Sequence, residues 1–66
     1  MGYKGYRGAV EVDVDGRLLF GRVTGLRDVI AFQGATGAEV HKEFRASVDA
    51  YLAFCAARGE APETPR

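Results

Sequence analysis

The stretch Gly25-Leu26-Arg27-Asp28-Val29-Ile30-Ala31-Phe32-Gln33-Gly34 decides the fold, because it joins a short strand to a long helix. It reads as a strand closed by a glycine, and it leads directly into a long amphipathic segment from Glu39 to Arg58. In that segment apolar residues recur at spacings of three and four, which is typical of a helix with one buried face. The members of this apolar stripe are Val40, Phe44, Val48, Tyr51, Leu52 and Cys55.

Residues typical of helix ends frame this segment. Thr36 and Glu39 have the spacing of a capping box, in which the threonine accepts from an early backbone N–H and the glutamate reaches back to another. At the other end, Gly59 is suited to the left-handed conformation that stops a helix. Within the helix, Arg45 and Asp49 are predicted to form an exposed ion pair one turn apart.

Two further strands precede this unit. From Tyr6 to Val14, apolar residues at even positions alternate with polar ones, which is typical of a strand with one buried face. Asp15-Gly16 is expected to form a tight hairpin turn. Residues 17–23 then return as a second strand, with Leu18 and Phe20 on one face and Leu19 and Val23 on the other. Apolar residues on both faces indicate a central strand, or one whose second face meets another chain. The third strand spans residues 29–33, and its short connection to the second predicts that the two are neighbours.

The sequence therefore predicts an α+β fold: a three-stranded antiparallel sheet, in the order β-β-β-α, covered on one face by one long helix. Residues 1–59 are expected to form this single domain, and residues 60–66, with two prolines, a tail or linker stub. The predicted core consists of Val10, Val12, Phe20, Ile30, Phe32, Phe44, Val48, Leu52 and Cys55.

Composition narrows the classes of function. Nine basic and nine acidic residues give a formal net charge of zero. Proteins that bind DNA or RNA through phosphate contacts normally carry a basic excess or patch, so direct nucleic-acid binding by this chain is not expected. No stretch approaches the length of a membrane span, and one cysteine allows no internal disulfide. We expect a cytoplasmic protein.

Few residues could perform catalysis. His41 and Cys55 lie fourteen positions apart on the predicted helix, or about 21 Å along its axis, too far to act as a pair. Asp13, Asp15 and Asp28 could be considered as metal ligands, but Asp15 is expected in the hairpin turn and Asp13 in a solvated position. No catalytic, metal-binding or cofactor-binding residue is predicted, and the protein is expected not to be an enzyme.

A second stripe of residues lies on the helix face opposite the predicted core. It comprises Ala46, Ala50, Ala53 and Ala57, with Phe54 at its margin. The high helix propensity of alanine is one explanation. The other is that small side chains let a partner helix approach closely. The second explanation makes this alanine stripe a predicted contact with a partner or with another copy of the chain.

Several short segments together resemble the HicB family of bacterial antitoxins, over nearly the whole chain. In the strands they are Tyr3-Lys4-Gly5-Tyr6, Gly21-Arg22-Val23, Leu26-Arg27-Asp28-Val29-Ile30 and Phe32-Gln33-Gly34. In the helix and its exit they are Phe44-Arg45, Ser47-Val48-Asp49, Tyr51-Leu52, Phe54-Cys55, Arg58-Gly59-Glu60 and Pro62.

The resemblance implies a partial RNase H-like module without a nuclease site, which neutralises a small mRNA-cleaving HicA toxin in a type II toxin–antitoxin system. Occlusion would be the mechanism, with carboxylates of the module meeting basic residues of the toxin. Such family members usually continue into a ribbon-helix-helix or helix-turn-helix domain, whereas this sequence stops at Thr64-Pro65-Arg66. It is either a stand-alone member or lacks a removed DNA-binding domain, and promoter binding by these residues is not expected.

Two alternatives remain open from the residues. One is a stand-alone oligomerising scaffold domain without catalysis, and the other is a metal-dependent nuclease. The small core, the free sheet edges and the alanine stripe also predict a homodimer or larger homo-oligomer.

Overall fold

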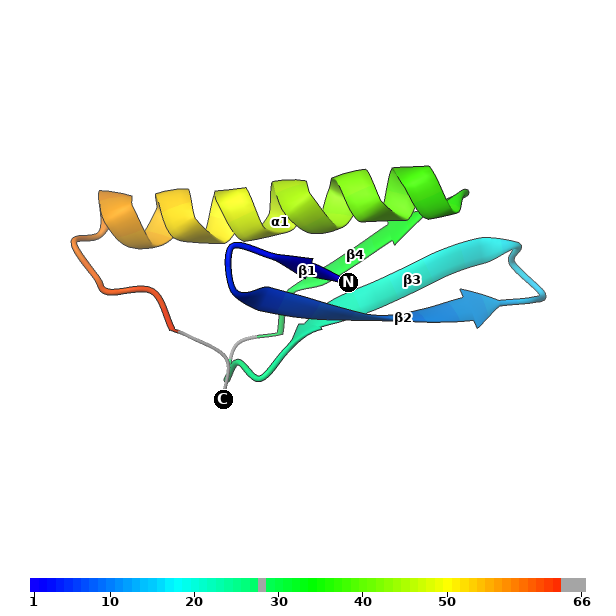
Figure 1. Ribbon diagram of the computed structural model, residues 1–66, viewed down its shortest axis with the longest axis horizontal. Coiled ribbons are helices and arrows are strands. Elements are labelled where there is room, and N and C mark those ends of the chain that lie inside the picture. The colour runs from blue at the N-terminus through cyan, green and yellow to red at the C-terminus, as the bar shows by residue number, and fades with distance from the viewer. Residues whose placement is uncertain (28, 64–66) are drawn as a thin grey trace.

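The computed structural model describes residues 1–27 and 29–63. Its elements are β1 (Gly2–Tyr3), β2 (Tyr6–Asp13), β3 (Leu18–Thr24), β4 (Ala31–Gly34) and α1 (Gly37–Ala57). The four strands form one antiparallel sheet in the order β1-β2-β3-β4, and α1 lies on one of its faces (Figure 1). An α+β fold with an antiparallel sheet and one long helix is confirmed, but the predicted number of three strands is wrong.

The additional strand, β1, comes from a tight turn near the N-terminus. Lys4 and Gly5 both have positive φ, at 52° and 85°, as the central residues of a two-residue hairpin loop require. Tyr3 pairs with Tyr6 across this turn. A strand of two residues contains no full period of alternation, so hydrophobic periodicity cannot reveal it.

The connection between β2 and β3 also differs from the prediction. The last pair of the ladder joins Asp13 to Leu18, so the loop contains the four residues 14–17 and not the tight two-residue turn predicted at Asp15-Gly16. Its left-handed residue is Arg17, with φ 53°. The Asp13 carboxylate accepts the Gly16 N–H at 3.1 Å and so stabilises the loop from within.

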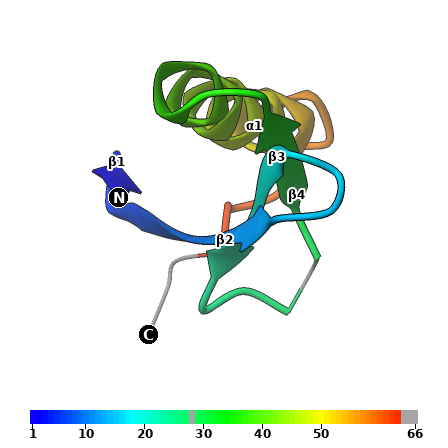
Figure 2. The ribbon, with the colours of Figure 1, turned by 90° about the vertical axis from the view of Figure 1, so that its right-hand side faces the viewer.

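The helix crosses the sheet diagonally. Its first turn lies so close to β4 that a Cβ at Gly34 would come within 2.5 Å of helix backbone. Further along, the Phe44 ring lies over Gly8 of β2, where a Cβ would come within 3.0 Å of the ring. Near its C-terminal end, Tyr51 packs edge-to-face on Tyr6 with 6.1 Å between ring centroids. The helix thus starts over β4 and reaches only the first half of β2 (Figure 2).

The predicted phase of the helix is confirmed. Val40, Phe44, Val48 and Cys55 are buried, and Tyr51 and Leu52 are partly buried. The core cluster joins the first three of these with side chains of three strands, namely Tyr6, Val23 and Phe32. Ile30 of the predicted core is partly buried against this cluster.

Three residues of the predicted core are exposed. Val10 and Val12 are 37% and 65% exposed and Phe20 is 42% exposed. Val10 and Val12 share the helix-facing side of β2 with Tyr6, but the diagonal helix does not extend over this part of the strand. Phe20 lies on the opposite face of β3, and buried Val23 takes the place beneath the helix. Because β3 is apolar on both faces, its alternation does not indicate which face the helix covers.

Both predicted helix caps form, with one change. The Thr36 hydroxyl accepts the Glu39 N–H at 3.1 Å, while the Glu39 carboxylate accepts from Ala35, one residue earlier than a capping box requires. At the other end Gly59 has φ 67°, and the Glu60 N–H donates to a carbonyl in the last turn at 2.9 Å. No helix within the described residues is long and apolar enough to cross a membrane.

Phe44 and Phe54 form a matched pair for testing this packing, because they are 0% and 55% exposed. Phe44→Ala is expected to reduce the free energy of unfolding by about 3–5 kcal/mol, since it leaves a cavity in the core. Phe54→Ala is expected to change it by less than about 0.5 kcal/mol. Thermal and denaturant unfolding followed by circular dichroism measures both, and equal losses would show that the helix face is assigned incorrectly.

Candidate binding surfaces

The residues considered for catalysis do not come together. His41 is half-buried, and its ring packs edge-to-face on Phe44 with 6.4 Å between centroids. Cys55 is a buried free thiol. The Asp13 carboxylate serves the hairpin loop, and Asp28 lies outside the described residues. Among residues 1–27 and 29–63, no group of three His, Cys, Asp or Glu side chains is placed to hold a metal ion.

The sheet face that points away from α1 is a larger feature. It is covered by no element of the described chain (Figures 1 and 2). Leu18 and Phe20 of β3 project from it and are 37% and 42% exposed. The pairing places Glu11 and Gln33 on either side of Phe20 in one row across the sheet. We call this surface the open face.

A hollow of about 210 Å³ lies in the open face. Its lining is largely apolar and includes Val29, which lies in the β3–β4 connection and is almost fully exposed. Glu11 and Arg22 bring one negative and one positive charge to it. The lining includes Ala9, Glu11, Phe20, Arg22, Val29 and Ala31. A hollow of this kind can receive an apolar side chain of a partner protein.

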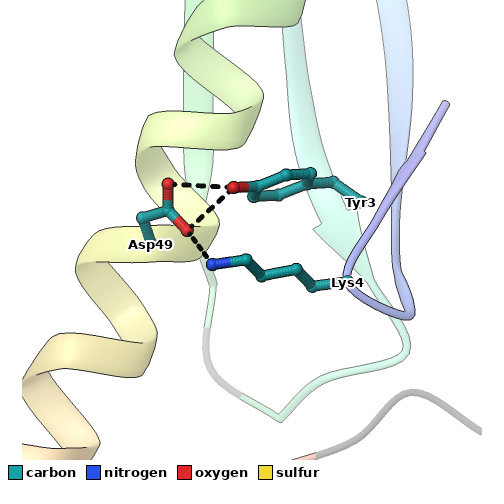
Figure 3. Close-up of polar contacts among 3 residues, drawn as sticks. All are labelled: Tyr3, Lys4 and Asp49. Carbon is teal, nitrogen blue, oxygen red and sulfur yellow. Dashed lines mark hydrogen bonds and ion pairs between the residues drawn. The ribbon is translucent and has the colours of Figure 1, made fainter.

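A polar cluster joins β1 to the helix (Figure 3). The Tyr3 hydroxyl donates to both carboxylate oxygens of Asp49 at 3.2 Å, and Lys4 Nζ forms an ion pair with the same carboxylate at 2.8 Å. The predicted pair between Arg45 and Asp49 is therefore wrong, because β1 brings Lys4 to this carboxylate. The hydrogen bond from Lys4 lowers the pKa of Asp49. The same bond raises the pKa of Lys4, and Tyr3 makes a smaller contribution in the same direction.

The segment after the helix folds back onto the domain. Glu63 donates its N–H to the Tyr51 hydroxyl at 2.9 Å and accepts from the Tyr6 hydroxyl at 2.7 Å through its carbonyl. Its carboxylate accepts the Arg27 N–H at 3.0 Å. Tyr6 is buried, and this burial raises the pKa of its phenol. Of the predicted tail, residues 64–66 lie outside the described residues.

The predicted contact stripe lies on the solvent side of α1. Its members Ala46, Ala50, Ala53, Phe54 and Ala57 are all exposed. The guanidinium of Arg58 lies over the Phe54 ring, with its central carbon 5.2 Å from the centroid. Contact of this stripe with a partner stays a prediction.

Sequence patterns do not reveal the open face, because they place Phe20 in the core. The signal that could have found it is the apolar character of both faces of β3, since α1 covers only one of them.

Comparison with family models, curated proteins and solved structures found no match for this chain.

The Lys4–Asp49 pair gives β1 a pH-dependent attachment. The pKa of Asp49 lies below 3.8 in the folded state, so its contribution to stability is present above pH 3.8 and is lost as the pH falls through the folded-state pKa. The pKa of Lys4 lies above 10.5, so its contribution is present below pH 10.5 and is lost as the pH rises through the folded-state value. Between these limits both groups are charged and the attachment is complete.

We expect Asp49→Asn to weaken this attachment without unfolding the domain, because the pair is exposed. The Gly8 amide, which donates to the Met1 carbonyl at 3.0 Å, is the probe. Its hydrogen exchange should be faster in Asp49→Asn at pH 6, and in the parent protein it should lose protection as the pH falls below 3.8. Asp15→Asn in the hairpin loop is the control, and identical protection in all three proteins would contradict the anchoring role.

Proposed function

We propose that this protein is an antitoxin-like binding module of a type II toxin–antitoxin system, which neutralises a small HicA-type mRNA-cleaving toxin by occlusion. The observation that carries the proposal is the open face of the sheet. Phe20 and Val29 line its hollow, and together with Leu18 they remain in contact with water in the isolated chain. A contiguous apolar surface of this kind is typical of a protein-binding site.

Occlusion requires no chemistry from this chain. An enzyme that cleaves mRNA presents a basic surface to the phosphate backbone. Glu11 at the hollow supplies a charge of opposite sign, and the apolar side chains around it supply area that excludes water. A protein bound in this way covers the toxin's RNA-binding surface. This chain would itself contact no nucleic acid and no membrane, and would act in the cytoplasm, where the toxin meets its mRNA.

The second candidate is an oligomerising scaffold, and the alanine stripe is the observation that favours it. Small side chains over three neighbouring turns of α1 allow a second helix to approach closely, and Phe54 beside them is 55% exposed. In this alternative the chain forms a homodimer or larger homo-oligomer through α1. The two candidates use opposite sides of the molecule, so they are separable by substitution.

The first test compares two exposed phenylalanines, Phe20 and Phe54. The purified chain should bind the HicA-type protein encoded beside it, stop its cleavage of mRNA, and by itself neither cleave RNA nor shift DNA at physiological salt. Phe20→Asp should weaken toxin binding by about 30-fold or more, the scale of an interface hot spot. Phe54→Asp is the control. Failure of the parent chain to bind or inhibit would refute the proposed function, and loss only in Phe54→Asp would place the toxin on the helix instead.

The second test addresses the alanine stripe. Ala50→Glu together with Ala53→Glu places charge where a partner helix would approach, while both residues remain compatible with a solvated helix. If α1 mediates oligomerisation, the mass in solution, measured by light scattering, should fall to that of one chain. An unchanged mass, fold and toxin affinity would show that the stripe reflects helix propensity alone.

A further inference from the structure

The outer edge of β2 is only partly paired. β1 pairs with Tyr6 and Arg7, and the Met1 carbonyl accepts the Gly8 N–H at 3.0 Å. From Ala9 to Asp13, no strand of the described chain lies beside this edge. An unpaired strand edge presents a row of backbone donors and acceptors that can pair with another chain.

The backbone groups at this edge belong to Val10 and Val12. The N–H groups of successive strand residues point to opposite sides, so residues two apart point to the same side. Gly8 directs its N–H outward to Met1, and its partner Val23 directs its own N–H away from β2, to the Ile30 carbonyl at 2.9 Å. Val10 and Val12 therefore also direct their N–H and C=O groups outward, where an added strand would bond them.

The side chains on the two sides of this edge differ in chemistry. On the helix-facing side, Val10 and Val12 are exposed because the diagonal helix leaves this corner of the sheet uncovered. On the open face, the same segment carries the carboxylates of Glu11 and Asp13, and Asp15 follows in the loop. There is no basic residue from Ala9 to Asp15. The edge thus combines two free backbone positions with an apolar side and an acidic side.

A second copy of the chain fits this edge poorly. Antiparallel pairing over Ala9–Asp13 would place Val10 opposite Val12 of the second copy, and Glu11 opposite the second copy's Glu11. Shifting the second copy by two residues toward the hairpin loop would place Glu11 opposite Asp13. Shifting it by two residues in the other direction would require the Gly8 amide to bond the second copy, but this amide already donates to the Met1 carbonyl. Like charges opposite one another destabilise a ladder, so the edge favours a partner of opposite charge.

The other edge of the sheet is less suited to strand addition. β4 has four residues, and its side chains on the open face, Ala31 and Gln33, carry no charge. Short edges without a charge pattern give a partner strand little to recognise.

We propose that the free edge of β2 accepts an amphipathic strand of a basic protein. Lysine or arginine residues of that strand face Glu11 and Asp13 on the open face, and apolar residues cover Val10 and Val12 beside the helix. The partner strand bonds the backbone of Val10 and Val12 and extends the sheet. This inference rests on the proposed function, because the toxin is the basic partner, and it names the edge that the toxin engages.

Val12→Pro tests the backbone bonds directly. Proline removes an N–H that points outward, so no bond of the internal ladder is lost, and proline is tolerated at such edge positions. Val12→Thr is the matched control, because it keeps both the N–H and the β-branched shape. Affinity for the HicA-type protein, measured by calorimetry, should fall at least tenfold in Val12→Pro and change less than threefold in Val12→Thr. Circular dichroism confirms that both variants are folded.

Glu11→Lys tests the charge pattern, and it keeps the proposal testable should Val12→Pro fail to fold. It should weaken the same complex at least fivefold, whereas Glu43→Lys on the exposed part of α1 should have no such effect. Hydrogen exchange of the parent complex should show new protection of the Val10 and Val12 amides. If the parent chain binds the toxin, but Glu11→Lys keeps full affinity and these amides stay unprotected, the edge proposal is overturned while the proposed function stands.

Absence of toxin binding by the parent chain would instead refute the proposed function. Protection of the same amides in the chain alone, together with the mass of a dimer, would overturn the choice of a basic partner and assign the edge to a second copy.

Discussion

The burial of Phe44 between two distant strands is the contact on which the rest of the structure depends. Its ring is fully buried, lies over Gly8 of β2, and packs on Phe32 of β4 with 5.3 Å between centroids. Phe44 is the middle of three contacts along α1, which together show that the helix crosses the sheet obliquely. This crossing brings the start of α1 onto Gly34 and its end onto Tyr6, and leaves the opposite corner of the sheet uncovered. The exposed valines of β2 are a consequence of this crossing, while the free edge of β2 results from the shortness of β1.

The two ends of the chain are held by polar contacts at the periphery of this core. Asp49 binds the turn after β1, and Glu63 bonds two tyrosines and the backbone of Arg27. These bonds involve exposed or partly buried groups, each of which contributes little when water competes for the same atoms. The centre of the molecule is thus stabilised by apolar packing, while the attachment of its ends depends on charge and on hydrogen-bond geometry. A change of pH that neutralises Asp49 or Lys4 therefore acts on the attachment of β1 before it affects the core.

The helix was predictable because its apolar stripe, from Val40 to Cys55, repeats over about four turns, and each repeat further defines which face of the helix is buried. For β2, alternation correctly placed Val10 and Val12 on the side of Tyr6. It could not predict their exposure, which depends on the crossing angle of a helix much later in the sequence. For β3, apolar residues on both faces gave no basis for choosing between Phe20 and Val23. The error at Phe20 concealed the open face, the surface on which the proposed function now rests. The bonds from Tyr3 and Lys4 to Asp49 were also not predicted, because β1 is too short for its alternation of side chains to be recognised.

Cys55 gives this small domain a reporter of its own motions. It is the only cysteine, its side chain is buried beneath the last turns of α1, and it forms no disulfide. A thiol in this position reacts with a modifying reagent only when those turns detach from the sheet. The rate of labelling therefore measures how often the C-terminal end of the helix opens, without any added probe. A partner that stiffens the sheet would slow this reaction from a distance, and one that only covers the surface would leave it unchanged.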